Sequence, residues 1–184
     1  MKAFLDLGSN KGKILKRFIA SPLCDEFTAI HAFEPNPQFG RKYISKYPKK
    51  AFVHREAVWT IDGTLDFFLS TSKKRSVACT ALSGKKTGHI NYVKPAVVQC
   101  IDFSKWLGEM FTNDDEVICK CDIEGAEYPV FKKMCEEGTI KIIKRLYMER
   151  HWQKFGWKKS VDDEFVSMLR ANGLEPLEDY SKFE

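Results

Sequence analysis

Four carboxylates each follow an apolar stretch of the kind that forms a buried strand: Asp6, Glu34, Asp122 and Glu149. Open α/β sheets bind their ligands at the carboxyl ends of their parallel strands, and those ends share one edge of the sheet. We therefore expect the four side chains to converge on a bound ligand. Carboxylates placed there can accept hydrogen bonds from hydroxyl groups, take up a proton or coordinate a cation.

Two further acids follow Asp122 closely. Asp122, Glu124 and Glu127 surround a single glycine at the start of a predicted helix. Capping is one explanation, because the helix dipole favours acidic side chains at a helix N-terminus. Three acids at this edge of the sheet exceed what capping requires, which favours a ligand site.

The turn after Asp6 has the composition of a nucleotide-binding loop. It reads Leu7-Gly8-Ser9-Asn10-Lys11-Gly12, and the residues that follow have helical periodicity. A buried strand, a tight turn and a helix N-terminus together bring a nucleotide close to backbone N–H groups. Gly8 and Gly12 can adopt positive φ and leave no Cβ between backbone and ligand. The alternative is a plain strand–helix connection that needs glycine only for its turn.

Glu34 stands about 20 residues beyond this turn, where a Rossmann-like βαβ unit places the carboxylate that binds the two ribose hydroxyls. Pro35-Asn36-Pro37 follows directly and restricts the backbone there. We therefore expect Glu34 to bind a ribose. A solvated strand end is the alternative.

Alternating strands and helices must position these side chains. After a first strand that ends near Asp6, the predicted strands are 28–33, 52–59, 96–101, 117–121, 145–148 and 175–177. Predicted helices are 14–19, 37–47, 102–111, one that starts near Glu127, and 162–173. The Asp62-Gly63 pair predicts a β-hairpin in which 65–69 returns alongside the third strand. The sequence thus predicts an α/β fold, with a mostly parallel central sheet, helices on both faces and an antiparallel hairpin insertion.

The composition is that of an ordinary globular domain. The 184 residues are 43% hydrophobic and 30% charged with a net charge of +5, and we expect one domain over residues 1–184. No apolar run is long enough to cross a membrane. The chain starts almost directly with a strand and its cysteines fit reduced thiols, so we expect no signal peptide and a cytoplasmic location. Residues 70–95, rich in Ser, Thr, Lys and Gly, form either a mobile lid over an acceptor or a plain solvated loop.

Four motifs together resemble the FkbM-type S-adenosylmethionine-dependent methyltransferases, which have the class I methyltransferase fold. They are Asp6–Gly12, Phe33-Glu34-Pro35-Asn36-Pro37, Lys120–Glu127 and Met148-Glu149-Arg150-His151. The resemblance extends from about Ala3 to Trp152, and the second and third motifs are its more specific parts. It implies S-adenosylmethionine as cofactor and methylation of a hydroxyl on a small molecule or sugar. Many such enzymes carry N-terminal helices over the acceptor, so for this chain the resemblance implies an altered acceptor pocket or a partner chain.

The resemblance also implies roles for individual residues. Asp6 should orient the ammonium of the cofactor through a hydrogen bond or a water, and Glu34 should bind the ribose diol. The remaining residues expected around the cofactor are Gly8, Ser9, Asn10 and Gly12 at the methionine end, Pro35 and Asn36 near the ribose, Ala57 and Val58 against the adenine, and Asp122.

A hydroxyl acceptor must lose a proton as it attacks, which requires a base or a metal ion. The candidate catalytic residues are Asp122, Glu124, Glu149 and His151. Some class I O-methyltransferases hold a divalent cation with acids after two neighbouring strands, and Asp122 and Glu149 are placed similarly. Oxygen ligands of this kind would suit Mg²⁺. The rival route makes His151 the base, because its unperturbed pKa lies near neutrality.

Two other functions fit parts of the sequence. The basic loop and the slightly basic composition are compatible with a nucleic-acid substrate, and RNA ribose methylation is the form that the motifs allow. A non-catalytic module that binds the cofactor without turnover is the second. A nicotinamide dehydrogenase fits less well, because the turn lacks G-x-G-x-x-G spacing.

Overall fold

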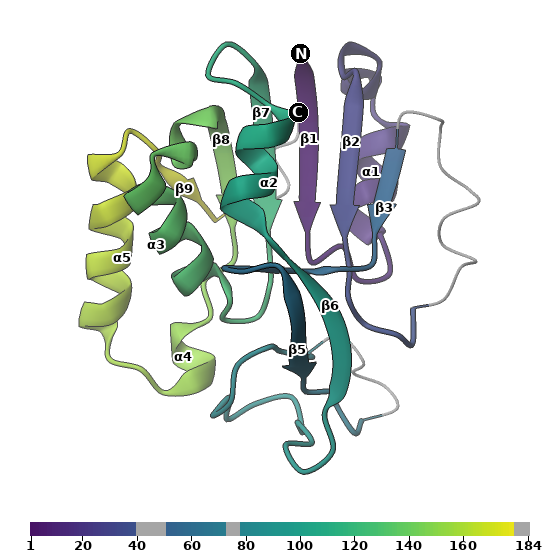
Figure 1. The fold of residues 1–184 in the computed structure, drawn as a ribbon, viewed down its shortest axis with the longest axis vertical. Helices are drawn as coiled ribbons and strands as arrows, with labels where there is room; N and C mark the ends of the chain where they lie inside the picture. The colour runs from purple at the N-terminus through teal and green to yellow at the C-terminus, as the bar shows by residue number, and fades with distance from the viewer. Residues whose placement is uncertain (40–50, 73–77, 179–184) are drawn as a thin grey trace.

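The computed structural model describes residues 1–39, 51–72 and 78–178. A six-stranded sheet forms its centre, in the order β3-β2-β1-β7-β8-β9 (Figure 1). All five pairings in this sheet are parallel. Its strands are β1 (Lys2–Leu7), β2 (Ala29–Phe33), β3 (Ala51–His54), β7 (Glu116–Cys121), β8 (Ile143–Met148) and β9 (Pro176–Leu177). The predicted α/β fold with a mostly parallel sheet is confirmed.

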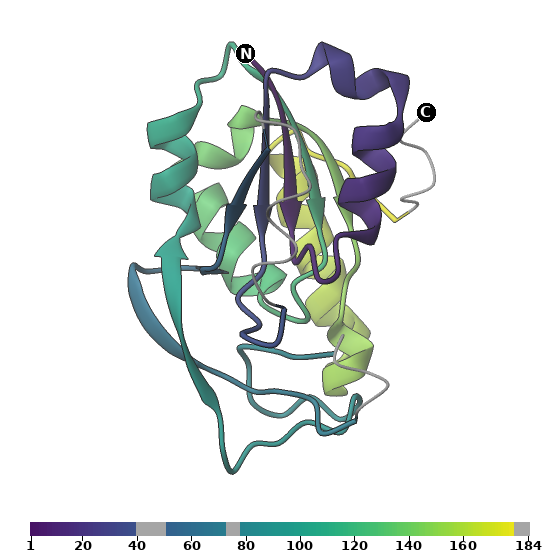
Figure 2. The same ribbon diagram turned by 90° about the vertical axis from the view of Figure 1, so that its right-hand side faces the viewer.

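Helices cover both faces of this sheet, as predicted (Figure 2). One face carries α1 (Lys13–Ala20) and the short 3₁₀ helix η1 (Pro22–Glu26). The other carries α2 (Phe103–Met110), α3 (Glu127–Glu137) and α5 (Lys159–Ala171), with the 3₁₀ helix η3 (Thr139–Ile142) between α3 and β8. The four-residue helix α4 (Trp152–Phe155) follows β8 near the carboxyl edge of the sheet.

Side-chain alternation along β1 assigns its residues to the two faces. Ala3, Leu5 and Leu7 belong to the core under α2, α3 and α5, whereas Phe4 packs with α1 and stacks on Phe18 at a ring-centroid distance of 4.0 Å. Successive side chains of a strand point to opposite faces, so β1 has to be apolar on both. The one polar exception in its buried part is Asp6, which points to the α1 side.

A second, three-stranded sheet corrects two predictions. The predicted third strand, residues 52–59, is broken after β3, and its second half becomes β4 (Ala57–Trp59), which pairs with β6 (Ala96–Asp102) instead of continuing in the main sheet. The strand β5 (Gly63–Phe67) pairs antiparallel with β6 and not with the strand before it. The order is β4-β6-β5, so the predicted hairpin was wrong in its partner although the antiparallel strand exists.

The physical reason lies in the segment between β4 and β5. Ala57 and Gly63 both lie opposite Cys100, one on each side of β6, so the chain passes around the end of that strand and does not turn back on itself. Asp62 stabilises this connection, because its carboxylate accepts a hydrogen bond of 3.0 Å from the Asp102 backbone N–H. A two-residue turn signal in a sequence carries no information about a third strand that inserts between its arms.

The remaining boundaries differ little from the predictions. Asp102 caps α2 as expected, and its side chain accepts a hydrogen bond from the Lys105 backbone N–H. Helix α5 begins at Lys159, three residues before the predicted start, and Gly173 follows it in the left-handed conformation. The predicted helix 37–47 falls mainly outside the described residues.

A buried ion pair joins the two central strands. Asp6 of β1 and Lys120 of β7 are register partners, and the Lys120 Nζ lies 3.0 Å from the Asp6 Oδ1. The same ammonium donates hydrogen bonds to the carbonyls of Gly8, at 2.8 Å, and Leu7, at 3.3 Å. Burial raises the pKa of Asp6, and Lys120 counteracts this. Burial opposes the charge of Lys120 too, yet the carboxylates of Asp6 and Asp122 outweigh it and raise the pKa of the lysine.

Replacing Lys120 with methionine should therefore destabilise the fold. The variant leaves Asp6 buried without a counter-charge, a change that costs about 3–5 kcal/mol in comparable cases. Urea unfolding at pH 7 measures the loss. The double variant Asp6→Leu/Lys120→Met removes both charges and should recover most of it, and a Lys120→Met protein as stable as the wild type would contradict this role.

Candidate active site

The turn between β1 and α1 lies tightly between its neighbours. Gly8 has φ of +74°, and a Cβ placed on it would lie 1.9 Å from the carbonyl oxygen of Asp122. The backbone N–H groups of Gly8 and Ser9 both donate to the Phe33 carbonyl at 3.0 Å. Gly12, with φ of +64°, is the N-cap residue of α1. Only a glycine at position 8 lets the turns after β1 and β7 approach this closely.

Glu34 connects this turn to the segment after β2. Its Oε2 accepts a hydrogen bond of 2.8 Å from the Asn10 backbone N–H, and its Oε1 accepts one of 2.9 Å from that of Asn36. Burial raises the pKa of Glu34 to about 6, although the two N–H groups and the nearby Lys120 act in the opposite direction. Asn10 has φ of +51°, a conformation that asparagine tolerates better than most residues.

A pocket opens at this edge of the sheet. Residues from the turn after β1, the segment after β2, β4 and the turn after β7 line it. Of the residues predicted from the sequence, those that line it are Gly8, Asn10, Glu34, Pro35, Asn36, Ala57, Val58, Asp122 and Glu124. The structure thus brings together side chains from four separate stretches of the chain.

Five predicted residues do not line the pocket. Ser9 and Gly12 shape the turn and do not form the wall. Asp6 is completely buried next to Lys120, so its carboxylate is not part of the wall and contacts the loop through that lysine. Glu149 and His151 do not line the pocket, but His151 lies 3.4 Å from Asp122 and 3.3 Å from Glu149.

Sequence reasoning missed the apolar half of the wall, which consists of Phe33, Phe39, Phe67, Cys79, Ala81, Ile123 and Ala126. Phe67 comes from the second sheet, and Cys79 and Ala81 come from the 70–95 segment. Single apolar residues in an apparent hairpin and in a polar loop carry no signal that marks them as pocket residues. The nearest signal was the length of the 70–95 segment, which fitted either a lid over an acceptor or a plain solvated loop.

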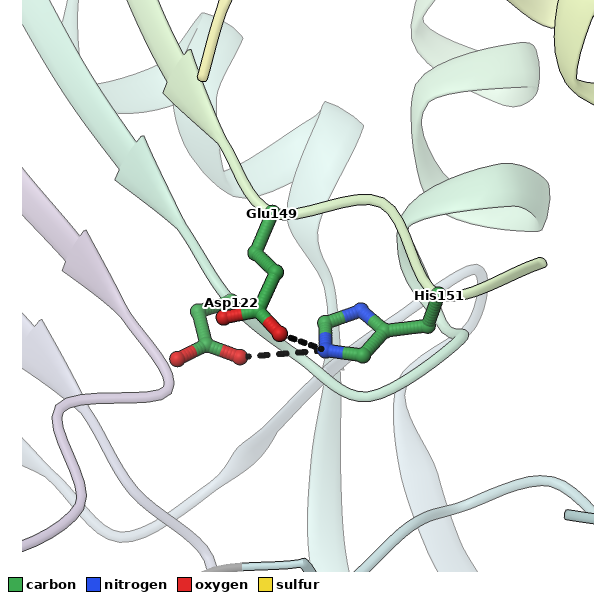
Figure 3. Close-up of side chains that lie close together, drawn as sticks. All are labelled: Asp122, Glu149 and His151. Carbon is green, nitrogen blue, oxygen red and sulfur yellow. Dashed lines mark ion pairs between the residues drawn. The ribbon is translucent and has the colours of Figure 1, made fainter. Parts of the chain in front are cut away.

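Three carboxylates surround one imidazole beside the pocket, and Figure 3 shows two of them, Asp122 and Glu149, with His151. The His151 Nε2 lies 3.4 Å from the Asp122 Oδ1, 3.3 Å from the Glu149 Oε1 and 3.3 Å from the Glu124 Oε2. His151 itself is fully buried. We refer to these four residues as the carboxylate–histidine cluster. The sequence predicted all four as catalytic candidates, and the structure places them together.

Glu127 fixes the other side of the imidazole. Its Oε1 lies 2.9 Å from the His151 Nδ1 and accepts a 3.0 Å hydrogen bond from the His151 backbone N–H. Its Oε2 accepts one of 2.8 Å from the Gly125 backbone N–H. Glu127 is completely buried and begins α3, so one of the three acids after Asp122 serves to orient the histidine and does not face the pocket.

The charges of the cluster shift the pKa values of its members in opposite directions. Burial alone would lower the pKa of His151, but the carboxylates of Asp122, Glu127 and Glu149 outweigh it and raise the pKa to about 11. The neighbouring imidazole of His151 lowers the pKa of Glu149 to about 2, against the effect of its partial burial. Unless another cation is bound, the imidazole therefore carries a positive charge at pH 7 and cannot accept a proton from an acceptor.

Thr80 and Lys85, from the segment between β5 and β6, contribute to the site through contacts with Glu124. The Lys85 Nζ, on a fully buried side chain, lies 2.5 Å from the Glu124 Oε2, and the Thr80 hydroxyl donates to the Glu124 carbonyl at 2.8 Å. Glu124 has φ of +54°, a costly conformation for a glutamate. These contacts, with the hydrogen bond from the Lys86 backbone to the Lys154 carbonyl, hold Glu124 toward His151.

The family model for the methyltransferase FkbM domain matches residues 6–175 of the chain. The chain belongs to the FkbM methyltransferase family. No curated protein and no solved structure matches it. Within the described residues of this FkbM methyltransferase, none of the helices combines the length and apolar character needed to cross a bilayer.

Membership agrees with the geometry already described. The Rossmann-like methyltransferase fold that the resemblance implied is confirmed by the parallel sheet with helices on both faces. A methyltransferase has to align a donor and an acceptor and to exclude water around them. In this FkbM methyltransferase the pocket combines the carboxylate of Glu34 with two members of the carboxylate–histidine cluster, Asp122 and Glu124.

Replacing Gly8 with alanine should disrupt the site. Gly138 is the matched control, because its φ of +78° is nearly the same and a Cβ there meets no atom within 4 Å. Gly138→Ala should cost about 1 kcal/mol through backbone strain alone. Gly8→Ala should cost about 2–3 kcal/mol more, because its Cβ meets a backbone carbonyl that cannot move aside. Urea unfolding measures both losses, and equal losses would contradict the close approach of the two turns.

Proposed function

We propose that this FkbM methyltransferase transfers the methyl group of S-adenosylmethionine to a hydroxyl oxygen of a small molecule or sugar. The observation that carries the proposal is the composition of one pocket wall. It includes Glu34, a half-buried carboxylate suited to a diol, and also Asp122 and Glu124 of the carboxylate–histidine cluster. A donor held by the first of these groups would present its reactive end toward the others.

The wall supports binding of the donor in three ways. Each oxygen of Glu34 accepts one backbone N–H and keeps a further acceptor position for a ribose hydroxyl. Ala57 and Val58 offer small apolar surfaces for an adenine ring. Gly8 presents bare backbone to the methionine portion, and Asp6 contributes from below by holding that loop through Lys120.

Methyl transfer to a hydroxyl forms an oxygen–carbon bond, breaks the carbon–sulfur bond of the donor and releases the hydroxyl proton. We assign the proton-accepting position to Asp122, because it lines the pocket and its side chain is one-third exposed. Burial alone would raise the pKa of Asp122, but His151 and Lys120 lower it, so the group is ionised at neutral pH. Glu149 lies beside it on the more exposed side of the cluster.

Calorimetry with S-adenosylhomocysteine tests the donor site. Glu34→Ala should weaken binding by about 3 kcal/mol, roughly a hundredfold in Kd, because the charged hydrogen bonds to the ribose are lost. Glu109→Ala, which removes an exposed carboxylate from α2, serves as the control and should bind like the wild type. Unchanged affinity in Glu34→Ala would refute the placement of the ribose.

Transfer of a labelled methyl group to a panel of sugars and small-molecule hydroxyls tests the reaction itself, with total RNA as a parallel acceptor. Transfer to a member of the panel supports the proposal. Transfer to RNA alone would replace the proposed acceptor class. Donor binding without transfer to any acceptor would indicate a non-catalytic module.

The binding of S-adenosylhomocysteine should also depend on pH. With a pKa of about 6, Glu34 is ionised above pH 7, but only about one molecule in eleven keeps its charge at pH 5. Affinity should therefore be constant from pH 7 to 8 and fall about tenfold by pH 5. Titrations at several pH values measure this, and Glu34→Ala should lose the dependence.

The free energy of unfolding of the ligand-free protein depends on pH in the opposite sense. The contribution of Glu34 to that free energy is complete below the unfolded pKa of 4.5, and it is lost as the pH rises through the folded pKa of about 6.

A further inference from the structure

We propose that the carboxylate–histidine cluster holds a divalent metal ion, with the His151 Nε2 and the carboxylates of Asp122 and Glu149 as its ligands. The oxygens of Asp122 and Glu149 and a nitrogen of His151 lie within 4.8 Å of one another, which one ion can span. Metal binding stands independently of the proposed methyl transfer. A role for the metal in activating the acceptor rests on that proposed function.

The His151 Nε2 is a buried nitrogen that faces carboxylate oxygens. The side chain is completely buried, and within the described part of the chain this nitrogen has no hydrogen-bond partner. It nevertheless faces three carboxylate oxygens at 3.3–3.4 Å. A buried polar atom without a hydrogen bond is costly unless something else binds it. A cation between the nitrogen and the oxygens of Asp122 and Glu149 would bind all three atoms, while Glu124 is paired with Lys85.

A buried carboxylate also orients the other ring nitrogen of His151. Metal-bound histidines almost always give their other ring N–H to a carboxylate or a carbonyl, which fixes the tautomer and orients the ring. Glu127 supplies this contact, with 2.9 Å between its Oε1 and the His151 Nδ1. Glu127 is itself held by the backbone N–H groups of Gly125 and His151. A proton on Nδ1 leaves the lone pair of Nε2 directed at the carboxylates.

The charges around the site also favour a divalent cation. The cluster and Glu127 contain four carboxylates. Lys85 lies 2.5 Å from Glu124 and Lys154 lies 2.8 Å from Glu149, whereas Lys120, 3.9 Å from Asp122, is balanced by its closer partner Asp6. With a neutral imidazole, two negative charges remain. A divalent cation neutralises both, whereas protonation of His151 neutralises only one.

The mixture of ligand atoms indicates which metal fits. Carboxylate oxygens suit Mg²⁺ and Mn²⁺, whereas imidazole nitrogen suits Zn²⁺ and Fe²⁺ better than Mg²⁺. A site with both kinds of ligand favours Mn²⁺ or Fe²⁺, so the histidine shifts the expectation away from the Mg²⁺ that oxygen ligands alone suggested. A cation at this position would lower the pKa of a hydroxyl group bound to it.

The site remains accessible on the pocket side. The side chains of Asp122 and Glu149 are 33% and 42% exposed, whereas those of His151 and Glu127 are completely buried. Asp122 also belongs to the pocket wall. A metal ion can therefore enter from solvent, and an acceptor in the pocket would lie close to it.

Mn²⁺ titration of the purified chain, followed by electron paramagnetic resonance, tests the proposal without a methyl donor. We expect one bound Mn²⁺ per chain, with a ¹⁴N hyperfine coupling from the imidazole. His151→Ala should abolish that coupling and weaken Mn²⁺ binding at least tenfold, and Glu127→Gln should weaken it by about 10- to 100-fold while the coupling remains. His89→Ala, which changes an exposed histidine, should leave both signals unchanged.

Glu149→Gln provides a second test if His151→Ala fails to fold, because its half-exposed side chain can be exchanged without opening the core. It should weaken Mn²⁺ binding at least tenfold. Absence of bound Mn²⁺ in the wild type would overturn the proposal, as would a ¹⁴N coupling that persists in His151→Ala. Calorimetry with S-adenosylhomocysteine on the same protein separates this failure from a failure of the proposed function, because the donor site does not include the metal ligands Glu149 and His151.

Discussion

The site depends on one buried ammonium group. The Lys120 Nζ lies between the two central strands, where it pairs with Asp6 and donates to the carbonyls of Leu7 and Gly8. It thereby ties the end of β7 to the turn that follows β1. A charge in this position is costly to bury, and its partners offset that cost only when all of them are in place. The position of the turn is consequently coupled to the integrity of the core.

Close approach and hydrogen bonding then hold the other loops in position. Gly8 admits the Asp122 carbonyl, and Glu34 joins the backbones of Asn10 and Asn36. The segments after β1, β2 and β7 are therefore held by mutual contacts and not by their own conformational preferences. Catalytic and binding geometry needs rigid support of this kind, because small displacements of reacting groups cost large factors in rate.

The opposite end of the pocket is organised by charge. Asp122, Glu124 and Glu149 would repel one another without a cation, and the fold places His151, Lys85 and Lys154 among them. Lys85 lies 39 residues before Glu124 in the sequence, in the polar segment between β5 and β6. Its ammonium group offsets part of the negative charge of the cluster. This arrangement keeps Glu124 in a strained conformation that the surrounding contacts have to maintain.

The sequence by itself determined the strands of a mostly parallel central sheet and most of the polar residues of the pocket. Asp122 and Glu34 follow apolar strands, and parallel strands end at a common edge, so their convergence follows from strand periodicity alone. Only the tertiary structure decided that β6 separates β4 from β5, that Phe67 and Cys79 line the pocket, and that Asp6 faces Lys120. It alone also decided that Glu127 orients His151, and that Lys85 reaches Glu124. These outcomes depend on contacts between segments distant in sequence, whereas periodicity and turn composition report only on neighbouring residues.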